Sequence, residues 1–302
     1  MAKRNKKGLP INGILLLDKQ LGFSSNSSLQ KAKRLFNAQK AGHTGSLDPL
    51  ATGVLPICFG EATKVSTFLL ESNKRYQTIA KLGQTSSTGD AEGEILLERE
   101  IPELSVDKIN QVLRQFTGEI SQVPPMYSAL KKDGKPLYEL ARKGEVVERK
   151  ARQVTIYELA LIEKTENTLV LDVNCSKGTY IRTLVEDIGE ALGCGAYVKM
   201  LRRTEVSPFE GCDSYRFDQL EALKKSGDLE KSLLPVDRAL QQWQQIEITK
   251  AESRAFLMGQ TIKVDLNDAD ENLRVYADNG DFLGIGYIKH PNSLAPKRVM
   301  IS

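Results

Sequence analysis

The sequence contains few of the residues on which metal and redox sites depend. It has only two histidines and four cysteines, and Cys58, Cys175, Cys194 and Cys212 are too widely spaced to form a C-x-x-C pair. Zinc sites require several such ligands at close spacing, so no metal site is expected. Cys58 and Cys175 fall in apolar strand patterns, which predicts reduced thiols in the core.

Long hydrophobic runs and nucleotide-binding motifs are also missing. No apolar run approaches the roughly 20 residues that a membrane helix requires, and the basic start of the chain precedes no signal-type apolar segment. The chain has neither a P-loop nor a G-x-G-x-x-G that opens a helix. We therefore expect a cytoplasmic protein that contacts no membrane, and the sequence shows no cofactor motif.

Positive charge is unevenly distributed along the 302 residues. The formal net charge is only +3, but residues 131–152 carry eight Lys and Arg against four Asp and Glu, a local surplus of 8 − 4 = +4. The tail at residues 1–9 is a second basic cluster. Such clusters can bind RNA phosphates, although an ordinary solvated helix face has the same composition.

The most informative segment is residues 42–53, which read GHTGSLDPLATG. Three glycines and a proline at this density predict a shaped loop. The apolar run that follows, residues 54–59, predicts a buried strand. A loop held by a core strand is a typical place for a catalytic group. Alternatively, Asp48 and Pro49 could only start a turn, with His43 as an ordinary loop histidine.

Strand and helix patterns alternate without a regular β-α-β order. Strands are predicted at residues 11–18, 54–59, 75–82, 154–162, 168–175 and 197–206, and helices after Ser24 and over 62–70, 106–117 and 179–192. Residues 83–93 form a polar segment that predicts a loop. This mixture favours an α+β fold with a mostly antiparallel sheet over a doubly wound one.

The pattern changes near residue 243. A short helix is predicted around residues 251–258, and the turn at 278–281 between apolar runs 273–277 and 282–288 predicts a β-hairpin. About 55 residues of small β structure therefore end the chain. Many small β-barrels share this pattern.

Residues 42–53 resemble the G-H-x-G-x-L-D-P motif of the TruB family of tRNA pseudouridine synthases, and the match extends from about Gly13 to Val206. The resemblance implies the pseudouridine synthase fold. It also implies a division into a basic tail at 1–9, a catalytic domain at 10–242 and a PUA-type RNA-binding domain at 243–302. Within the catalytic domain, residues of about 124–152 correspond to the family's insertion that clamps the T arm of tRNA.

The resemblance assigns three catalytic residues. In the family the motif aspartate, here Asp48, is the nucleophile. The segment SKGTYIRTL resembles the second family motif, so Arg182 would pair with Asp48; a guanidinium fork fixes both the charge and the orientation of a carboxylate. The segment Arg75-Tyr76-Gln77 resembles the family's K-x-Y, in which the tyrosine stacks on the flipped uracil and is a candidate to take the proton from C5.

Four further residues are assigned to substrate binding by the same resemblance. Tyr180 and Leu201 would line the pocket, and His43 would contact the RNA loop from which the uridine is extruded. Asp90 either holds the pocket by hydrogen bonds or only caps a turn. Each of these residues also has an ordinary structural explanation as a core, strand or loop side chain.

The implied function is isomerisation of uridine-55 to pseudouridine in the T loop of tRNA, by a monomer that needs no cofactor and no guide RNA. The uracil returns to the same sugar, so one carboxylate can suffice, unlike in glycosidases that use two. An RNA-binding or tRNA-folding protein with incidental isomerase activity is the alternative. A hydrolase that uses Asp48 with Asp90 as the partner acid is a third possibility.

Overall fold

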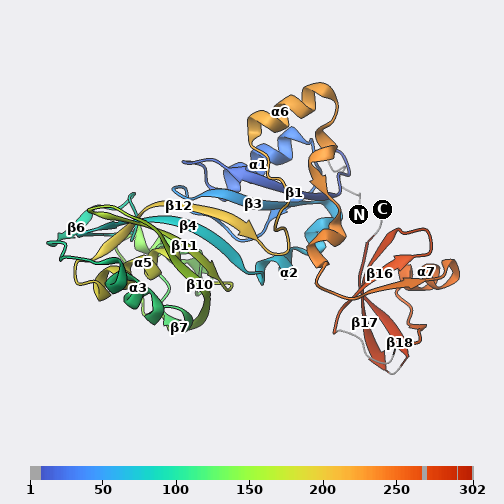
Figure 1. The fold of residues 1–302 in the computed structure, drawn as a ribbon. Helices are drawn as coiled ribbons and strands as arrows, with labels where there is room; N and C mark the ends of the chain where they lie inside the picture. Colours follow the sequence, from blue (N-terminus) through green and yellow to red (C-terminus); the bar gives the residue numbers. More distant parts are fainter. Residues whose placement is uncertain (1–7, 267–270, 291, 301–302) are drawn as a thin grey trace.

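In a computed structural model, the chain is described over residues 8–266, 271–290 and 292–300. These residues form a large mixed sheet covered by helices, and a smaller β-rich unit at the C-terminal end (Figure 1). None of the helices described is long and apolar enough to cross a membrane. Of the predicted basic tail, residues 1–7 lie outside the described part.

The main sheet has nine strands over the described residues. In spatial order they are β13 (Leu233–Leu234), β1 (Gly13–Lys19), β3 (Thr52–Phe59), β12 (Ala196–Val206), β4 (Lys74–Leu82), β11 (Thr168–Cys175), β10 (Arg152–Lys164) and β7 (Gly118–Gln122), with β2 (Ala41–His43) paired to β3. Every pairing is antiparallel except that of β3 with β12. The predicted α+β fold with a mostly antiparallel sheet is confirmed.

Successive side chains of β1 point to opposite faces of the sheet, and both faces are covered. Leu15 and Leu17 pack in one core with helical side chains from one side, whereas Ile14 and Leu16 pack in a second core on the other side. A strand buried on both faces needs a continuous apolar run, which is why its sequence lacks alternation. Cys58 and Cys175 are buried and free, as predicted.

The helices divide between the two faces of the sheet. Those that contribute to the first core are α1 (Ser25–Leu35), α3 (Val106–Gln115), α5 (Ile181–Ala191) and α6 (Phe217–Ser226). The second core is covered by η1 (Gly60–Lys64), α2 (Ser66–Leu70) and η3 (Val236–Leu240). A further short helix, η2 (Leu229–Ser232), precedes β13.

Two local predictions were wrong in detail. The helix predicted over residues 62–70 is two short pieces, η1 and α2, because the hydroxyls of Thr63 and Ser66 hydrogen-bond to backbone carbonyls three residues earlier. The loop predicted at 83–93 begins with β5 (Gln84–Ser86), which pairs with β6 (Ile95–Glu98). That hairpin is polar in its first strand, so it lacks the apolar alternation that predicts a strand.

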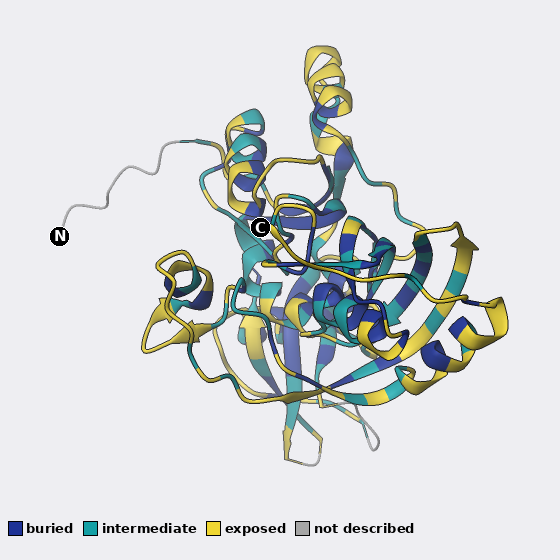
Figure 2. Ribbon diagram, turned by 90° about the vertical axis from the view of Figure 1, so that its left-hand side faces the viewer, coloured by how far each residue is buried: buried dark blue, intermediate teal, exposed yellow. Residues whose placement is uncertain are grey.

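The predicted insertion contains little regular structure. It holds a two-stranded ribbon, β8 (Lys131–Lys132) with β9 (Lys135–Pro136), followed by the short helix α4 (Leu137–Ala141). Leu137 and Leu140 are buried, while the ribbon and most residues of 142–152 are exposed. Figure 2 colours each residue of the chain by its burial, with exposed residues in yellow. The basic side chains of the insertion are therefore accessible to a polyanion.

The C-terminal unit is a five-stranded sheet with one helix. Its elements are β14 (Gln245–Ile248), α7 (Lys250–Leu257), β15 (Ile262–Lys263), β16 (Leu273–Ala277), β17 (Phe282–His290) and β18 (Ser293–Val299). The predicted hairpin β16–β17 is confirmed. Ile285 and Met300 enter the second core beside Ile14, and Lys64 Nζ donates to the Val299 carbonyl at 2.7 Å. The C-terminal unit thus packs on the main sheet.

Candidate active site

The loop between β2 and β3 presents Asp48, and its backbone is fixed on both sides of that residue. The Ser25 hydroxyl accepts from the Leu47 amide at 2.7 Å and donates to the Leu47 carbonyl at 2.9 Å. On the other side, the Pro49 carbonyl accepts from the Gly22 amide at 2.9 Å and from Lys19 Nζ at 3.3 Å. Asp48 therefore has a defined position although its side chain is 46% exposed.

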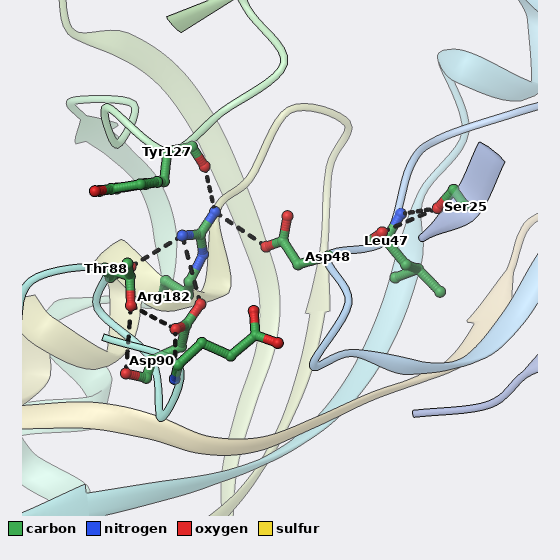
Figure 3. A network of polar contacts seen from close by, with 8 residues as sticks. Ser25, Leu47, Asp48, Thr88, Asp90, Tyr127 and Arg182 are labelled. Carbon is green, nitrogen blue, oxygen red and sulfur yellow. Dashed lines mark hydrogen bonds and ion pairs between the residues drawn. The ribbon is translucent and has the colours of Figure 1, made fainter. Parts of the chain in front are cut away.

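The Asp48 carboxylate lies against the guanidinium of Arg182, which stands in the first turn of α5 (Figure 3). Arg182 Nη2 is 3.0 Å from Asp48 Oδ2, and the Arg182 side chain is only 6% exposed. The same nitrogen donates to the Tyr127 carbonyl at 2.6 Å, and Nη1 donates to the Thr88 carbonyl at 2.9 Å. Four groups thus hold Arg182, since Asp90 Oδ2 lies 3.5 Å from Nη1.

Asp90 makes both kinds of contact that the sequence left open. One carboxylate oxygen faces Arg182, while the other accepts from the Thr88 hydroxyl at 2.5 Å and from the Glu92 amide at 3.1 Å. Its side chain is 4% exposed. The buried carboxylate therefore links Arg182 to the turn at 88–92; it meets Nη1 of the guanidinium, whereas Asp48 meets Nη2 (Figure 3).

A cavity of about 300 Å³ opens in front of Asp48. Its walls come from the Asp48 loop, the start of β4, the middle of β12, Ser128 and Ala129, and the segment that leads into the first turn of α5. The side chains with polar or aromatic character in its lining are Ser46, Asp48, Lys74, Tyr76, Ser128, Ser176, Thr179, Tyr180, Arg182 and Arg203, and Leu201 adds an apolar wall. A volume near the lower end of the range of about 300–1,000 Å³ suits one small planar group.

The structure brings five of the seven predicted site residues to this cavity: Asp48, Tyr76, Tyr180, Arg182 and Leu201. Asp90 lies behind Arg182 and does not line it. His43 lies on β2, opposite Ile57 of β3, and is also outside the lining; its Nδ1 is buried without a hydrogen-bond partner among the described residues. Gly45, two residues later, is in the lining.

Burial controls the titration of the groups around the cavity. It raises the pKa of the Asp48 carboxyl above its usual value, and the Arg182 charge opposes that rise. Asp90 adds to the rise as a like charge, and Lys19 opposes it. Burial likewise raises the pKa of the phenols of Tyr76 and Tyr180.

Sequence reasoning missed three buried cations near Asp48. Lys19 is fully buried and donates to three carbonyls, and burial lowers its pKa to about 8. Lys74 lines the cavity, and residues 74–76 read Lys-Arg-Tyr, which fits the letters K-x-Y, whereas 75–77 read Arg-Tyr-Gln. Arg203 is buried in β12. For Lys19 a signal was available, since it ends the apolar strand β1 and lysine is rarely buried without a partner.

Other hollows of the described surface lack comparable groups. One of about 760 Å³ is lined by residues 101–105 and by Lys164, Glu166 and Asn167, with no aromatic side chain. Its larger volume reflects an open surface depression, whereas the smaller cavity gathers aromatic and charged groups from distant segments. No group of three or more possible metal ligands occurs among the described residues.

Comparison with known proteins decides the family. The model described as "TruB family pseudouridylate synthase (N terminal domain)" matches residues 33–181, and the "tRNA pseudouridylate synthase B C-terminal domain" model matches 182–241. A third, "Pseudouridine synthase II TruB, C-terminal", matches 245–300. The chain belongs to the TruB family.

Two relatives cover almost the whole of this TruB-family chain. The tRNA pseudouridine synthase B of Pseudomonas fluorescens is 53% identical over 97% of this chain and 96% of its own length. That of Pseudomonas paraeruginosa is 50% identical over 100% of both chains. The family predicted from residues 42–53 is therefore confirmed, as is the predicted enzyme class.

Solved structures share the fold of this TruB-family chain. One, titled as an H/ACA RNP bound to a substrate RNA containing 2'-deoxyuridine, has a TM-score of 0.75 at 23% identity and covers 100% of this chain and 92% of its own. A Cbf5-Nop10-Gar1 complex has a TM-score of 0.72 at 26% identity, over 95% of this chain and 84% of its own. The β-rich C-terminal unit is confirmed, while its PUA-type assignment remains a prediction.

Proposed function

We propose that this chain isomerises uridine-55 of the tRNA T loop to pseudouridine, acting as a monomer without guide RNA or cofactor. The observation that carries the proposal is the ion pair between Asp48 and Arg182 at 3.0 Å, on the wall of a cavity lined by Tyr76 and Tyr180. The relatives named tRNA pseudouridine synthase B support tRNA as the substrate.

Asp48 is the group that acts on the nucleotide. As a carboxylate it can attack C1′ of the ribose, attack C6 of the base or remove the 2′ proton. In each case the bond from N1 to C1′ breaks, the same uracil turns, and a bond from C5 to C1′ forms. C5 loses its proton and N1 gains one, so the product is an isomer of the substrate. Nothing is oxidised, reduced or consumed, so Asp48, oriented by Arg182, needs no second reactant.

The cavity receives a base that has left the RNA stack. Its volume of about 300 Å³ accepts one nucleoside rather than a paired duplex, so the uridine must be extruded before reaction. Tyr76 stacks on the uracil and is the base for its C5 proton, while Tyr180 and Leu201 form the remaining walls. His43 contacts the loop that the uridine has left.

The insertion at about 124–152 binds the T arm. Lys131, Lys132 and Lys135 project from an exposed ribbon, and the segment as a whole has a surplus of +4. The segment also reaches the active site, since Tyr127 accepts a hydrogen bond from Arg182. Phosphate binding at this segment can therefore affect the position of Arg182, through its hydrogen bond to the Tyr127 carbonyl.

The structure weakens the case for a hydrolase. A glycosidase-type reaction would require a second carboxylic acid facing the sugar. Asp90 was the candidate, but it is 4% exposed and lies behind Arg182, outside the cavity. An RNA-folding role is compatible with the same basic surfaces, and it would persist in a protein whose Asp48 is inactivated.

The proposal is tested with an unmodified tRNA transcript and the purified chain, without added cofactor or guide. Pseudouridine is mapped by carbodiimide modification and primer extension. One new stop at the T-loop uridine, absent with Asp48→Asn, supports the proposal. Tight binding without any stop would leave an RNA-binding role, and release of free uracil would indicate hydrolysis.

A further inference from the structure

Arg203 is the largest fully buried side chain among the described residues, at 1% exposure. Its Nε donates to the Val54 carbonyl at 2.7 Å, and its Nη2 donates to the Gly45 carbonyl at 2.9 Å. These two carbonyls lie on opposite sides of Asp48 in the sequence. One rigid guanidinium therefore joins the start of the loop that presents the nucleophile to the strand β3 that follows the loop.

The backbone of Arg203 is equally close to both catalytic segments. In β12 it lies opposite Gly53 of β3, in the parallel pairing, and opposite Tyr76 of β4, in the antiparallel pairing. Gly53 has φ +99°, and a Cβ there would lie 2.1 Å from the Arg203 carbonyl oxygen. Only glycine allows this approach.

The charge of Arg203 is not neutralised by an ion pair within the described residues. Arg182, in contrast, pairs with Asp48, and Arg202, which precedes Arg203 in β12, pairs with Asp18 at 2.9 Å. Neighbouring groups respond to that charge. Burial lowers the pKa of Lys74 to about 8 and also lowers that of His43, and in both cases Arg203 contributes to the decrease. For the Tyr76 phenol, burial raises the pKa and Arg203 opposes the rise.

We propose that Arg203 is a positioning residue for the isomerisation: it fixes the Asp48 loop against β12 and sets the distance between Asp48 and Tyr76 across the cavity. The inference rests on the proposed function, because it concerns the geometry of that reaction. Arg203 meets the two carbonyls with two different nitrogens of one planar group, Nε and Nη2, so it fixes their relative position. A lysine keeps the charge but loses this planar fork. Displacing a catalytic group by about 1 Å can reduce a rate by about 100-fold.

The test compares Arg203→Lys and Arg203→Met with Arg202→Lys, a control in the same strand whose side chain is 39% exposed and outside the cavity lining. Single-turnover rate, tRNA affinity and hydrogen exchange of the peptide covering residues 44–53 are measured for each. We expect both Arg203 variants to react about 100-fold more slowly. Affinity should stay within about threefold, because phosphate contacts dominate it.

Hydrogen exchange distinguishes a positioning role of Arg203 from a general role in the stability of the fold. In the Arg203 variants, the 44–53 peptide should exchange faster while β11 (residues 168–175) exchanges as in the wild type. Wild-type rates in both variants would overturn the proposal. So would a slow reaction with an unchanged loop, or faster exchange throughout the sheet. If instead the wild type and Arg202→Lys make no pseudouridine, the proposed function is wrong. The hydrogen exchange of residues 44–53 would still show whether Arg203 holds the loop.

Discussion

Asp48 and Arg182 lie 3.0 Å apart but differ sharply in exposure, at 46% and 6% of their side chains. The buried guanidinium is held by two carbonyls and by Asp90 before any substrate arrives. The cation is therefore the fixed partner, and the carboxylate is the one that faces the incoming nucleotide. This arrangement suits a nucleophile that must leave its ion pair in part to reach the sugar or the base.

Asp48→Asn should abolish turnover and leave tRNA affinity within about tenfold, because phosphate contacts provide most of the affinity. The amide keeps the shape of the carboxylate but removes its charge and its nucleophilicity. Filter binding and single-turnover assays on the same preparation measure the two properties. Wild-type turnover by this variant would contradict the assignment of the nucleophile.

Arg182→Met should destabilise the fold by about 3 kcal/mol and abolish activity, because it leaves the buried Asp90 carboxylate without its cation. The double variant Arg182→Met with Asp90→Asn should recover part of the stability and none of the activity. Chemical denaturation measures the free energies of unfolding. Equal stability of the single and double variants would show that the Asp90 charge is not paired with Arg182.

Reaction rate should decrease on acidification at a pH above the usual aspartate pKa. The nucleophile acts as a carboxylate, and burial raises the pKa of Asp48 above 3.8, so protonation removes the active form earlier than for an exposed aspartate. Asp90→Asn removes a like charge and should move the acid limb to lower pH. Single-turnover rates across the acid range give the pH–rate profiles of the wild type and Asp90→Asn, and circular dichroism checks that both remain folded. An acid limb that does not move in Asp90→Asn, or that moves to higher pH, would contradict the effect of Asp90 on Asp48.

Tyr76→Phe should react at least about 100-fold more slowly while binding tRNA normally, because the ring remains for stacking but the proton acceptor is lost. Tyr76→Leu should lose affinity for the extruded base as well. Competition binding with unmodified tRNA separates the two effects. A fully active Tyr76→Phe would limit Tyr76 to stacking.

Gly53→Ala should destabilise the fold by at least about 2 kcal/mol, since its φ is +99° and a Cβ would meet the Arg203 backbone at 2.1 Å. Gly42→Ala is the matched control: it has ordinary φ, and a Cβ there meets no atom within 4 Å. Thermal and chemical unfolding of the two variants should differ clearly. Similar stabilities would mean that β3 and β12 can separate without cost.

Much of the fold was predictable because local signals agreed with the tertiary structure. The Ser24 N-cap and the face containing Leu29 and Ala32 gave α1, and the turn at 278–281 gave the β16–β17 hairpin. The helix at 62–70 failed because hydroxyl side chains compete locally with helical hydrogen bonds, which periodicity does not record.

The site residues were predictable where a family motif assigns them a role. They were not predictable where their role depends only on their position in the folded structure. Asp48 and Arg182 stand in such motifs. Arg203 stands in the segment Met200-Leu201-Arg202-Arg203-Thr204, which resembles the family's L-R-R-T, but the sequence assigned it no role, because its contacts are with backbone carbonyls that any sequence supplies. The apolar run before Lys19 could indicate that this lysine is buried, but its contact with Pro49 depends on how the first strand packs against the loop, which the local sequence does not show.

The position of β12 between β3 and β4 has a consequence for synthesis of the protein. β4 is the next strand of the main sheet after β3 along the chain, yet the two strands do not pair with each other. Each pairs instead with β12 (residues 196–206), which lies between them. A nascent chain that ends before this strand holds Asp48 on one half-sheet and Tyr76 on the other, with two open strand edges. We expect the ribosome-bound chain to gain its activity abruptly, in the single step in which β12 joins the halves.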